Sequence, residues 1–317
     1  MSNKYDFSFN VSALTDFKNE NTAVVQELMF SPTTIASGIE LIVGQKGDFA
    51  LNTLANDVYL SAAACGWTVD ASNSVIFGQS TVELESLELK QALCPQTLTT
   101  KWVSQLMRAG SNPEELPFEQ YIVDGIVSKL GVEIEKMFWR GNKSTGVDNL
   151  SLVDGMAKYL TGKGSIFVND ASGDITVSNV IDKVNALVLS MPDEILERTD
   201  LAIYMGPDTY RTYVAALIKS QYPIDNTSQT KPYGKSLMIP GYDIEAIMTV
   251  GLSGTGFMYA TSKANLVAGT DAMSDSENIE VWYSKDNDEY RLKTTFKFGV
   301  GCYFPQFVAH NNPAITA

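Results

Sequence analysis

The sequence predicts an α+β fold built around one long helix. β-type patterns lie on both sides of that helix, and an α/β segment separates it from the final β-rich stretch. The chain has 317 residues, which is enough for one large domain or two medium ones with a proper core. In chain order we expect an arm, a β excursion, the long helix, the α/β segment and a returning sheet.

The arm covers residues 1–45, which show no strong hydrophobic period. Short helices are expected over 22–30, where Pro32 follows, and over 31–43. An arm that leans on other elements fits this pattern better than an independent domain does.

The β excursion covers 49–93. Residues 57–60 and 75–78 favour strands, and turn residues lie between them over 70–73. Residues 81–89 alternate apolar and polar side chains at period two, which predicts a half-exposed strand. This hairpin-like excursion has little to bury on its own, so it needs a partner surface.

The long amphipathic helix is predicted over 112–140. Asn112 is a capping residue, and Pro113 suits the first helical turn. The apolar positions recur every four residues, at Phe118, Ile122, Ile126, Leu130, Ile134 and Phe138. A period near 3.6 sustained this long indicates one helix of roughly 35 Å. Gly125 and Gly131 each weaken it by about 1 kcal/mol relative to alanine, so close packing is expected there.

The α/β segment covers 146–235. Ser178 is expected to cap a helix over 179–190. Residues 201–205 form a continuous apolar run, which is typical of a buried strand, and a helix over 209–219 follows.

Residues 236–310 are β-rich again. A strand-forming stretch over 239–247 leads into a glycine-rich turn and then into 257–260. Strands over 279–283 and 290–298 flank a good hairpin turn.

The composition is acidic and somewhat poor in charge. The formal net charge is −14, and charged residues make up 19% of the chain, where about 25% is usual. A subunit that covers much of its surface with neighbours needs fewer charges. No Lys/Arg cluster occurs, the nearest approach being Lys158 and Lys163, which argues against tight nucleic-acid binding. The alternative of an acidic wall that faces DNA without binding it tightly stays open.

The cysteines Cys65, Cys94 and Cys302 match neither a CxxC metal pair nor a disulfide framework, so reduced and mostly buried thiols are expected. The first residues lack the apolar core of a signal peptide. No apolar run approaches the roughly 20 residues of a membrane span. The sequence therefore predicts a protein of the cytosol, or of something assembled there, with no membrane partner.

Motifs for catalysis are nearly missing from the sequence. His310 is the only histidine and lies near the end of the chain, so we expect a tail residue near solvent. One histidine also excludes a multi-His metal site. The glycine-rich stretch over 251–256 looks like a phosphate loop, but it lacks the GK[ST] ending and a following helix, so a turn is expected.

Two acidic groups are candidates for a calcium loop and for a catalytic carboxylate pair. Asp271, Asp275 and Glu277 do not meet the spacing of a calcium loop, and a solvated acidic loop is expected. Nothing in the spacing of Asp148 and Asp154 favours a catalytic carboxylate pair over surface positions. We therefore predict no catalytic residue, no cofactor and no metal, and a protein that works by its shape and contacts rather than as an enzyme.

Five local stretches, together with the order of elements, resemble one family. The stretches are Phe138-Trp139-Arg140-Gly141-Asn142 followed by Gly146; Leu201 to Met205 followed by Pro207-Asp208-Thr209-Tyr210; Leu237-Met238-Ile239-Pro240-Gly241-Tyr242; Ala264-Asn265-Leu266-Val267-Ala268-Gly269-Thr270-Asp271; and Phe298-Gly299-Val300-Gly301. They are similar to successive motifs of the major capsid proteins of tailed bacteriophages, which have the Hong Kong 97-type fold. The resemblance covers roughly residues 45–310.

The resemblance implies an organisation into parts. The expected parts are an N-terminal arm over 1–45, an E-loop β-hairpin over 46–95, a peripheral domain over 96–145 and 236–317 with its spine helix over 112–140, and an axial domain over 146–235.

The same resemblance implies a function. Copies of the chain would assemble as hexamers and pentamers into the icosahedral shell around the dsDNA genome of a tailed bacteriophage, without sequence-specific DNA binding. The protein would be found in the virion capsid, after assembly in the host bacterial cytoplasm. Portal, scaffolding and decoration proteins are further partners of such shells. Because the chain begins at Met1, no cleaved scaffolding segment is expected, and Lys46 shows no motif for the covalent Lys–Asn crosslink of some members.

Two other classes stay open. An encapsulin, a bacterial compartment shell that packages an enzyme on the same fold, would look alike in sequence, and neighbouring genes would distinguish it. A hydrolase or binding domain with a cryptic carboxylate site is the second, and a monomeric, active protein would support it.

Overall fold

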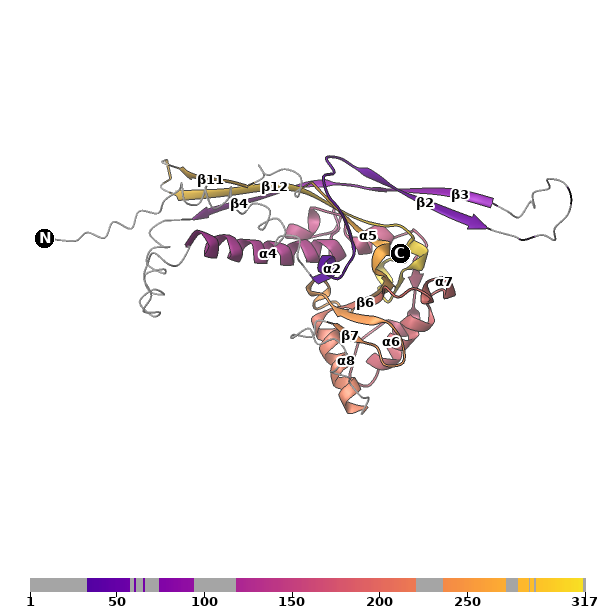
Figure 1. Cartoon of the computed structure of the whole chain (residues 1–317). Helices are drawn as coiled ribbons and strands as arrows, with labels where there is room; N and C mark the ends of the chain where they lie inside the picture. The colour runs from indigo at the N-terminus through magenta and orange to yellow at the C-terminus, as the bar shows by residue number, and fades with distance from the viewer. Residues whose placement is uncertain are drawn as a thin grey trace.

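The computed structural model has an elongated part and a compact lobe (Figure 1). A long, narrow layer of strands runs along the molecule, and one long helix lies beneath it. The lobe hangs below this layer and holds a second sheet with its helices. The structure describes residues 33–57, 60, 65, 74–93, 118–220, 236–271, 279–284, 286–287 and 289–315. This mixture of helix and sheet confirms the predicted α+β class.

The long sheet is organised around one fourteen-residue strand, β12. Its strands are β1 (Glu40–Ile42), β4 (Glu85–Leu93), β10 (Leu266–Thr270), β11 (Ile279–Ser284) and β12 (Glu289–Cys302). The first part of β12 pairs with β11 on one side and β4 on the other, and its last five residues pair with β10. The predicted hairpin around residue 286 is therefore confirmed as β11 and β12.

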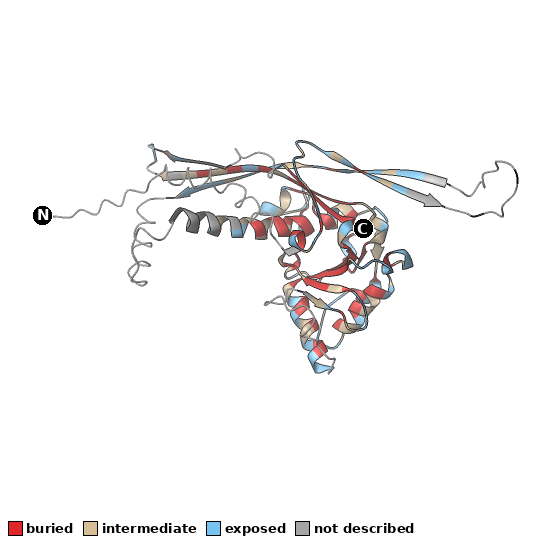
Figure 2. Cartoon of the chain, in the orientation of Figure 1, coloured by how far each residue is buried: buried red, intermediate tan, exposed pale blue. Residues whose placement is uncertain are grey.

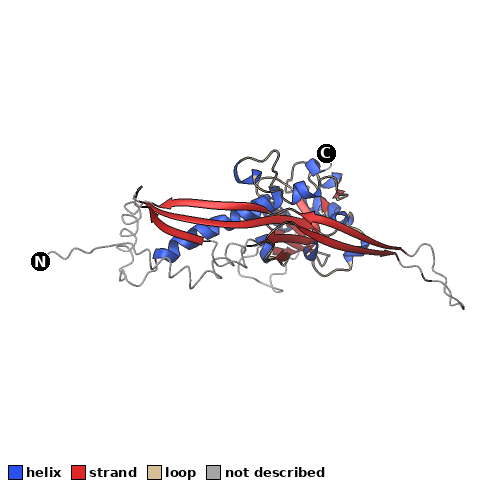
Figure 3. Ribbon diagram, turned by 90° about the horizontal axis from the view of Figure 1, so that it is seen from above, coloured by secondary structure: helices blue, strands red, loops and turns tan. Residues whose placement is uncertain are grey.

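A second hairpin projects beyond the lobe, as seen from above in Figure 3. It consists of β2 (Phe49–Asp57) and β3 (Ser74–Val82), which pair antiparallel from Phe49–Val82 outward to Asp57–Ser74. We call β2 and β3 the projecting hairpin. The single strand predicted over 81–89 is wrong, because the chain leaves β3 at Val82 and enters the long sheet as β4 at Glu85. Side-chain alternation continues through this step, so the pattern does not show the change of partner.

The long helix is α4 (Phe118–Arg140), and its predicted end at Arg140 is confirmed. Its predicted start signal at Asn112 lies outside the described residues. Towards its C-terminus the helix buries one face, and Phe138 and Trp139 are fully inaccessible. The close packing expected at Gly125 is wrong, since nothing approaches within 4 Å of a Cβ there.

The lobe contains a six-stranded sheet in the order β5-β13-β9-β6-β8-β7. The strands are β5 (Ile166–Phe167), β6 (Leu201–Met205), β7 (Ser236–Met238), β8 (Glu245–Met248), β9 (Met258–Ser262) and β13 (Ala309–His310). The predicted buried strand over 201–205 is confirmed as β6, all five residues of which are buried. The expected domain boundary at 235 falls between strands of this one sheet, because β7, β8, β9 and β13 follow it in the chain.

The helices of the lobe are α6 (Val180–Leu189), α7 (Asp193–Leu196) and α8 (Pro207–Lys219). The helix predicted over 209–219 is confirmed and begins two residues earlier, at Pro207. The cap predicted at Ser178 is wrong: Asn179 occupies the cap position, and its Oδ1 accepts a hydrogen bond from the Thr176 N–H.

The remaining described elements are short. They are α2 (Thr33–Ala36), α5 (Met156–Leu160), and the 3₁₀ helices η2 (Asp148–Ser151), η3 (Asn169–Ala171), η4 (Val250–Leu252), η5 (Lys263–Asn265), η6 (Pro305–Phe307) and η7 (Pro313–Ile315). The helix predicted over 31–43 is wrong: α2 has four residues, Gly38 follows at φ 104°, and β1 begins at Glu40. Glycine accepts this left-handed conformation, which ends the helix.

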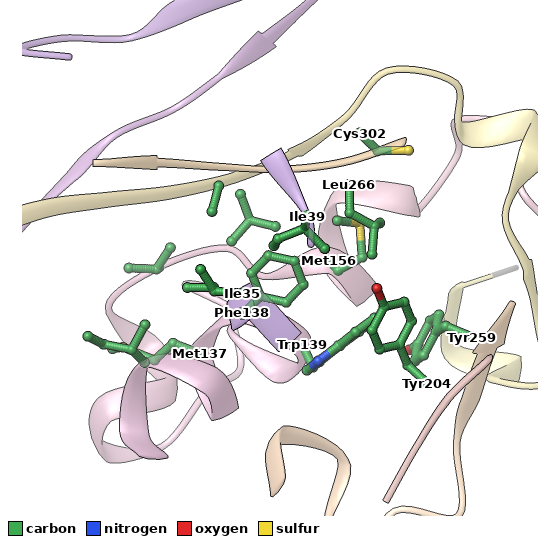
Figure 4. Packing of buried hydrophobic residues seen from close by; sticks show 14 of the residues in the cluster. Ile35, Ile39, Met137, Phe138, Trp139, Met156, Tyr204, Tyr259, Leu266 and Cys302 are labelled. Atoms are coloured by element: carbon green, nitrogen blue, oxygen red, sulfur yellow. The ribbon is translucent and has the colours of Figure 1, made fainter. Parts of the chain in front are cut away.

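Two hydrophobic cores share strand β6 as a wall, and Figure 2 shows the buried band through this region. Ala202 and Tyr204 face the core under the long sheet, whereas Leu201, Ile203 and Met205 face the core of the lobe. This alternation follows from the period-two geometry of a strand. Figure 4 shows the first core, with aromatic and aliphatic side chains meeting between α4, α2 and the sheets. No helix in the described part of the chain is long and apolar enough to cross a membrane.

Candidate assembly surfaces

The base of the projecting hairpin rests on three glycines of the long sheet. Gly269 in β10 pairs directly with Gly299 in β12, and Gly301 lies two residues further along β12. A Cβ at any of the three would come under 3.0 Å from the hairpin base or the turn after it, closer than real Cβ atoms come. We call these residues the glycine seat. Glycine in a strand marks such a close approach of another segment.

A small core fixes the hairpin on this seat. Leu51 of β2 and Val82 of β3 are buried against Val267 of β10. Beside it, the Ser80 hydroxyl lies 2.9 Å from the Tyr159 hydroxyl, which in turn donates to the carbonyl of Cys302 at 3.2 Å. The base of the hairpin is therefore anchored to the rest of the chain by apolar and polar contacts together.

An ion-pair cluster holds the turn between β3 and β4. The Lys143 ammonium lies 2.8 Å from a carboxylate oxygen of Glu83 and 2.8 Å from one of Glu85. The backbone N–H of Lys143 donates to Asp154 at 2.7 Å. The hydrogen bonds to Glu83 and Glu85 raise the pKa of Lys143. We call Lys143 with these three carboxylates the lysine clasp; it ties the turn after α4 to the foot of the hairpin.

The body of the hairpin exposes apolar side chains. Phe77 is 82% exposed, and Leu54, its partner across the strand pair, is 51% exposed. Ile76 is 57% exposed. Exposed apolar residues grouped on one element mark a surface for contact with another molecule. The hairpin is thus fixed at its foot and open to a partner along its body.

A groove runs between α4 and β4. Its volume is about 690 Å³, and Leu89, Ile126, Leu130 and Leu152 are among its apolar lining residues. Glu133 also lines the groove, and its carboxylate forms an ion pair with the Lys136 ammonium at 2.7 Å. The groove is a second concave surface of the elongated part.

His310, expected near solvent, is fully buried, so that prediction is wrong. It lies in β13, a strand near the C-terminus that inserts between β5 and β9 in the lobe sheet. This insertion buries the histidine. Its Nε2 is 3.1 Å from the Ser165 hydroxyl, and burial lowers its pKa to about 4. The apolar residues before it, 307–309, were the one local signal of a buried strand.

The other candidate site residues from the sequence occupy ordinary structural positions where the structure describes them. The stretch 251–256 forms η4 and a turn followed by β9, so the predicted turn is confirmed. Asp148 opens η2, while Asp154 belongs to the lysine clasp. Asp271 accepts a hydrogen bond from the Lys297 N–H. Asp275 and Glu277 lie outside the described residues.

The cysteines are described in part. Cys302 is buried and burial raises its pKa to about 12, but Cys65 is exposed, so the expectation of mostly buried thiols is wrong there. Cys94 lies outside the described residues. Within the described ranges, no three or more His, Cys, Asp or Glu side chains gather as metal ligands would.

Comparison with known proteins identifies the fold through structure, since no family model and no curated protein matches the sequence. A chain of the satellite phage P4 procapsid, which includes the size determination (Sid) protein, is 11% identical with a TM-score of 0.55, over 92% of this chain and 96% of that one. The capsid of an empty GTA particle is 13% identical, with a TM-score of 0.56 over 88% of each chain. A chain of Gordonia phage Cozz is 11% identical, with a TM-score of 0.53 over 91% of this chain and 85% of that one.

The fold is the Hong Kong 97-type capsid fold. The resemblance indicated by the sequence motifs is confirmed at this level. The capsid fold covers the long sheet and the lobe together, since the matches extend over most of both chains. At these identities the likeness establishes the fold alone.

Proposed function

We propose that this chain is the major capsid protein of a tailed bacteriophage, which assembles with copies of itself into an icosahedral shell around dsDNA. The observation that supports this most is the projecting hairpin, whose foot is fixed on the glycine seat while Leu54 and Phe77 stay exposed along its body. A monomer gains no stability from apolar side chains that a projecting hairpin leaves in solvent. A shell subunit gains a contact with its neighbour.

The parts of the fold take the following roles in the proposal. The projecting hairpin is the E-loop, α4 is the spine helix, and the long sheet with α4 is the peripheral domain. The six-stranded lobe is the axial domain. We assign β4 to the peripheral domain instead of the E-loop, because it pairs along its whole length with β12.

The energetics suit a repeated interface. Fully burying a side chain such as Phe77 or Leu54 contributes about 1.5–3 kcal/mol. One docked hairpin therefore supplies only a few kcal/mol, before the entropy lost on association is subtracted. A closed shell repeats the contact on every subunit, so weak single contacts give a stable assembly. Hexamers and pentamers are the units expected in this proposal.

The role is structural and not catalytic in this proposal. The net charge of −14 disfavours overall attraction to phosphates, which suits a wall that encloses dsDNA without sequence-specific binding. The virion capsid is its proposed location, with assembly in the host bacterial cytoplasm. Portal, scaffolding and decoration proteins are proposed further partners.

The test is the state of the purified full-length chain. Size-exclusion chromatography and negative-stain electron microscopy should show large closed particles. Small discrete species under all conditions would exclude a shell protein. Particles produced in the native host and filled with dsDNA support the phage capsid, whereas native particles filled with a protein cargo support the encapsulin alternative.

A further inference from the structure

A short segment near the start of the described chain packs into the core under the long sheet. Residues 33–44 begin with α2, cross α4 and end in β1, which pairs with the edge of β10. Glycines at positive φ lie inside and at the end of this segment, Gly38 at 104° and Gly44 at 77°. Ile35 and Ile39 point into the core beside Phe138 (Figure 4). We call residues 33–44 the strap.

The strap meets a buried carboxylate on the long helix. Glu135 is 3% exposed, and its Oε1 accepts hydrogen bonds from the backbone N–H and the hydroxyl of Thr34, at 3.2 and 2.7 Å. The hydroxyl of Thr249, which follows β8 of the lobe, donates to the same oxygen. Thr34 and Thr249 are both fully buried. Three separate parts of the fold thus converge on one oxygen atom.

Each of the two threonine hydroxyls both donates and accepts a hydrogen bond. The Thr34 hydroxyl donates to Glu135 and accepts from the Trp139 indole N–H at 2.9 Å. The Thr249 hydroxyl donates to Glu135 and accepts from the Gly251 N–H at 3.3 Å. If the strap left, Glu135 would lose two of these donors, and the Trp139 N–H would lose this acceptor. Leaving part of a buried polar network unsatisfied is costly, so we expect the hydrogen bonds of this cluster to form and open together.

The cluster also lies where the long helix meets the lobe. A Cβ on Gly251 would come under 3.0 Å from the Glu135 carbonyl oxygen and from the Trp139 ring. The turn after Thr249 is therefore pressed directly onto α4, and the cluster lies at that joint.

We propose that Thr34, Glu135 and Thr249 form a latch that couples docking of the strap to closure of the joint between the long helix and the lobe. Release of the strap and loosening of the joint are then one event. In the proposed shell, and resting on that proposed function, the latch sets the angle between axial and peripheral domains and so the shape of the subunit that enters the shell.

Hydrogen–deuterium exchange of the full-length, unassembled subunit tests the coupling. Thr34→Val removes the hydroxyl at nearly constant volume and should accelerate exchange at least tenfold in three segments together: 34–42, 135–140 and 249–252. Thr34→Ser keeps a hydroxyl and should restore slow exchange. Ser128→Ala removes an exposed hydroxyl on the same helix outside the groove; it is the matched control and should change none of the three. Acceleration of 34–42 alone would overturn the latch.

A second measurement needs no variant that risks misfolding. In the wild-type subunit under low denaturant, the slowest amides of the three segments should open with one free energy and one denaturant dependence. Clearly different values among the segments would overturn the coupling. If the chain forms no shell at all, the proposed function fails while these exchange results still decide the latch. If shells form, Thr34→Val should broaden their diameters relative to Ser128→Ala, and equally uniform shells would overturn the role in shape.

Discussion

Gly299 of β12 lies directly against the carbonyl oxygen of Glu83, so closely that no Cβ fits between them. Glu83 belongs to the two-residue step at which the chain passes from the projecting hairpin into β4. Because Gly299 has no side chain, the foot of the hairpin can cross the sheet at this point.

Gly299→Ala should destabilise the subunit. The added methyl group must displace the backbone at Glu83, and overpacking of this kind costs about 1–3 kcal/mol. Chemical denaturation of the unassembled subunit measures the free energy of unfolding. The control is Gly125→Ala, at an exposed helical position with nothing within 4 Å, which should raise stability by about 0.5–1 kcal/mol. Equal effects of the two substitutions would contradict the glycine seat.

Phe77→Ser should weaken assembly and leave the subunit intact. Phe77 is 82% exposed, so its removal should change the free energy of unfolding by no more than about 0.5 kcal/mol. The protein concentration needed for particle formation should rise at least tenfold, measured by sedimentation over a concentration series. Val147→Ser, at an apolar residue 72% exposed after the long helix, is the control. An unchanged threshold for Phe77→Ser would show that the hairpin body makes no contact in the particle.

Lys143→Met should make stability less dependent on salt. Its ion pairs are partly exposed, so the loss should stay below about 1 kcal/mol and shrink at high ionic strength. The pKa of Lys143 is raised, so its contribution is fully present below the unfolded value of about 10.4 and is lost as the pH rises through the higher folded pKa. Denaturation at pH 8 in low and high salt measures the effect. The control is Lys90→Met, at a lysine whose side chain is 68% exposed, and it should change the free energy of unfolding little. A larger loss of stability for Lys90→Met than for Lys143→Met would contradict the lysine clasp.

His310 should make the fold sensitive to acid. Its folded pKa of about 4 lies below the ordinary value of 6.5, so the unfolded chain binds the proton first. Stability is complete above pH 6.5 and falls as the pH drops toward 4, by on the order of 2–4 kcal/mol. Denaturant midpoints from pH 7.5 to 4 should show this slope in the wild type and a smaller one in His310→Gln. Parallel slopes for the two proteins would assign the acid sensitivity to other groups.

Local patterns predicted the elements that depend on local physics. The four-residue spacing from Phe118 to Phe138 predicted α4 and its end, and the apolar run 201–205 predicted β6. The helix buries one face and the strand buries both faces. In each case the spacing of apolar residues within the element itself shows this.

Long-range contacts explain what the sequence did not reveal. His310 is buried because β13 inserts between β5, far earlier in the chain, and β9. Glu135 looks like any polar residue on a helix, and its burial depends on Thr34 and Thr249, which lie 101 and 114 residues away. No local period encodes such partners. The glycines of 298–301 belong to a family-like strand motif in the sequence, but their steric role depends on distant residues, since Glu83 lies against Gly299 and Val82 lies against Gly301.

Cryo-electron microscopy of particles formed by the full-length chain tests the central claim most directly. The account predicts closed icosahedral shells in which the projecting hairpin of each subunit extends from its own glycine seat and buries Phe77 against another subunit. A purified chain that stays monomeric, or a particle in which Phe77 remains in solvent, would contradict it.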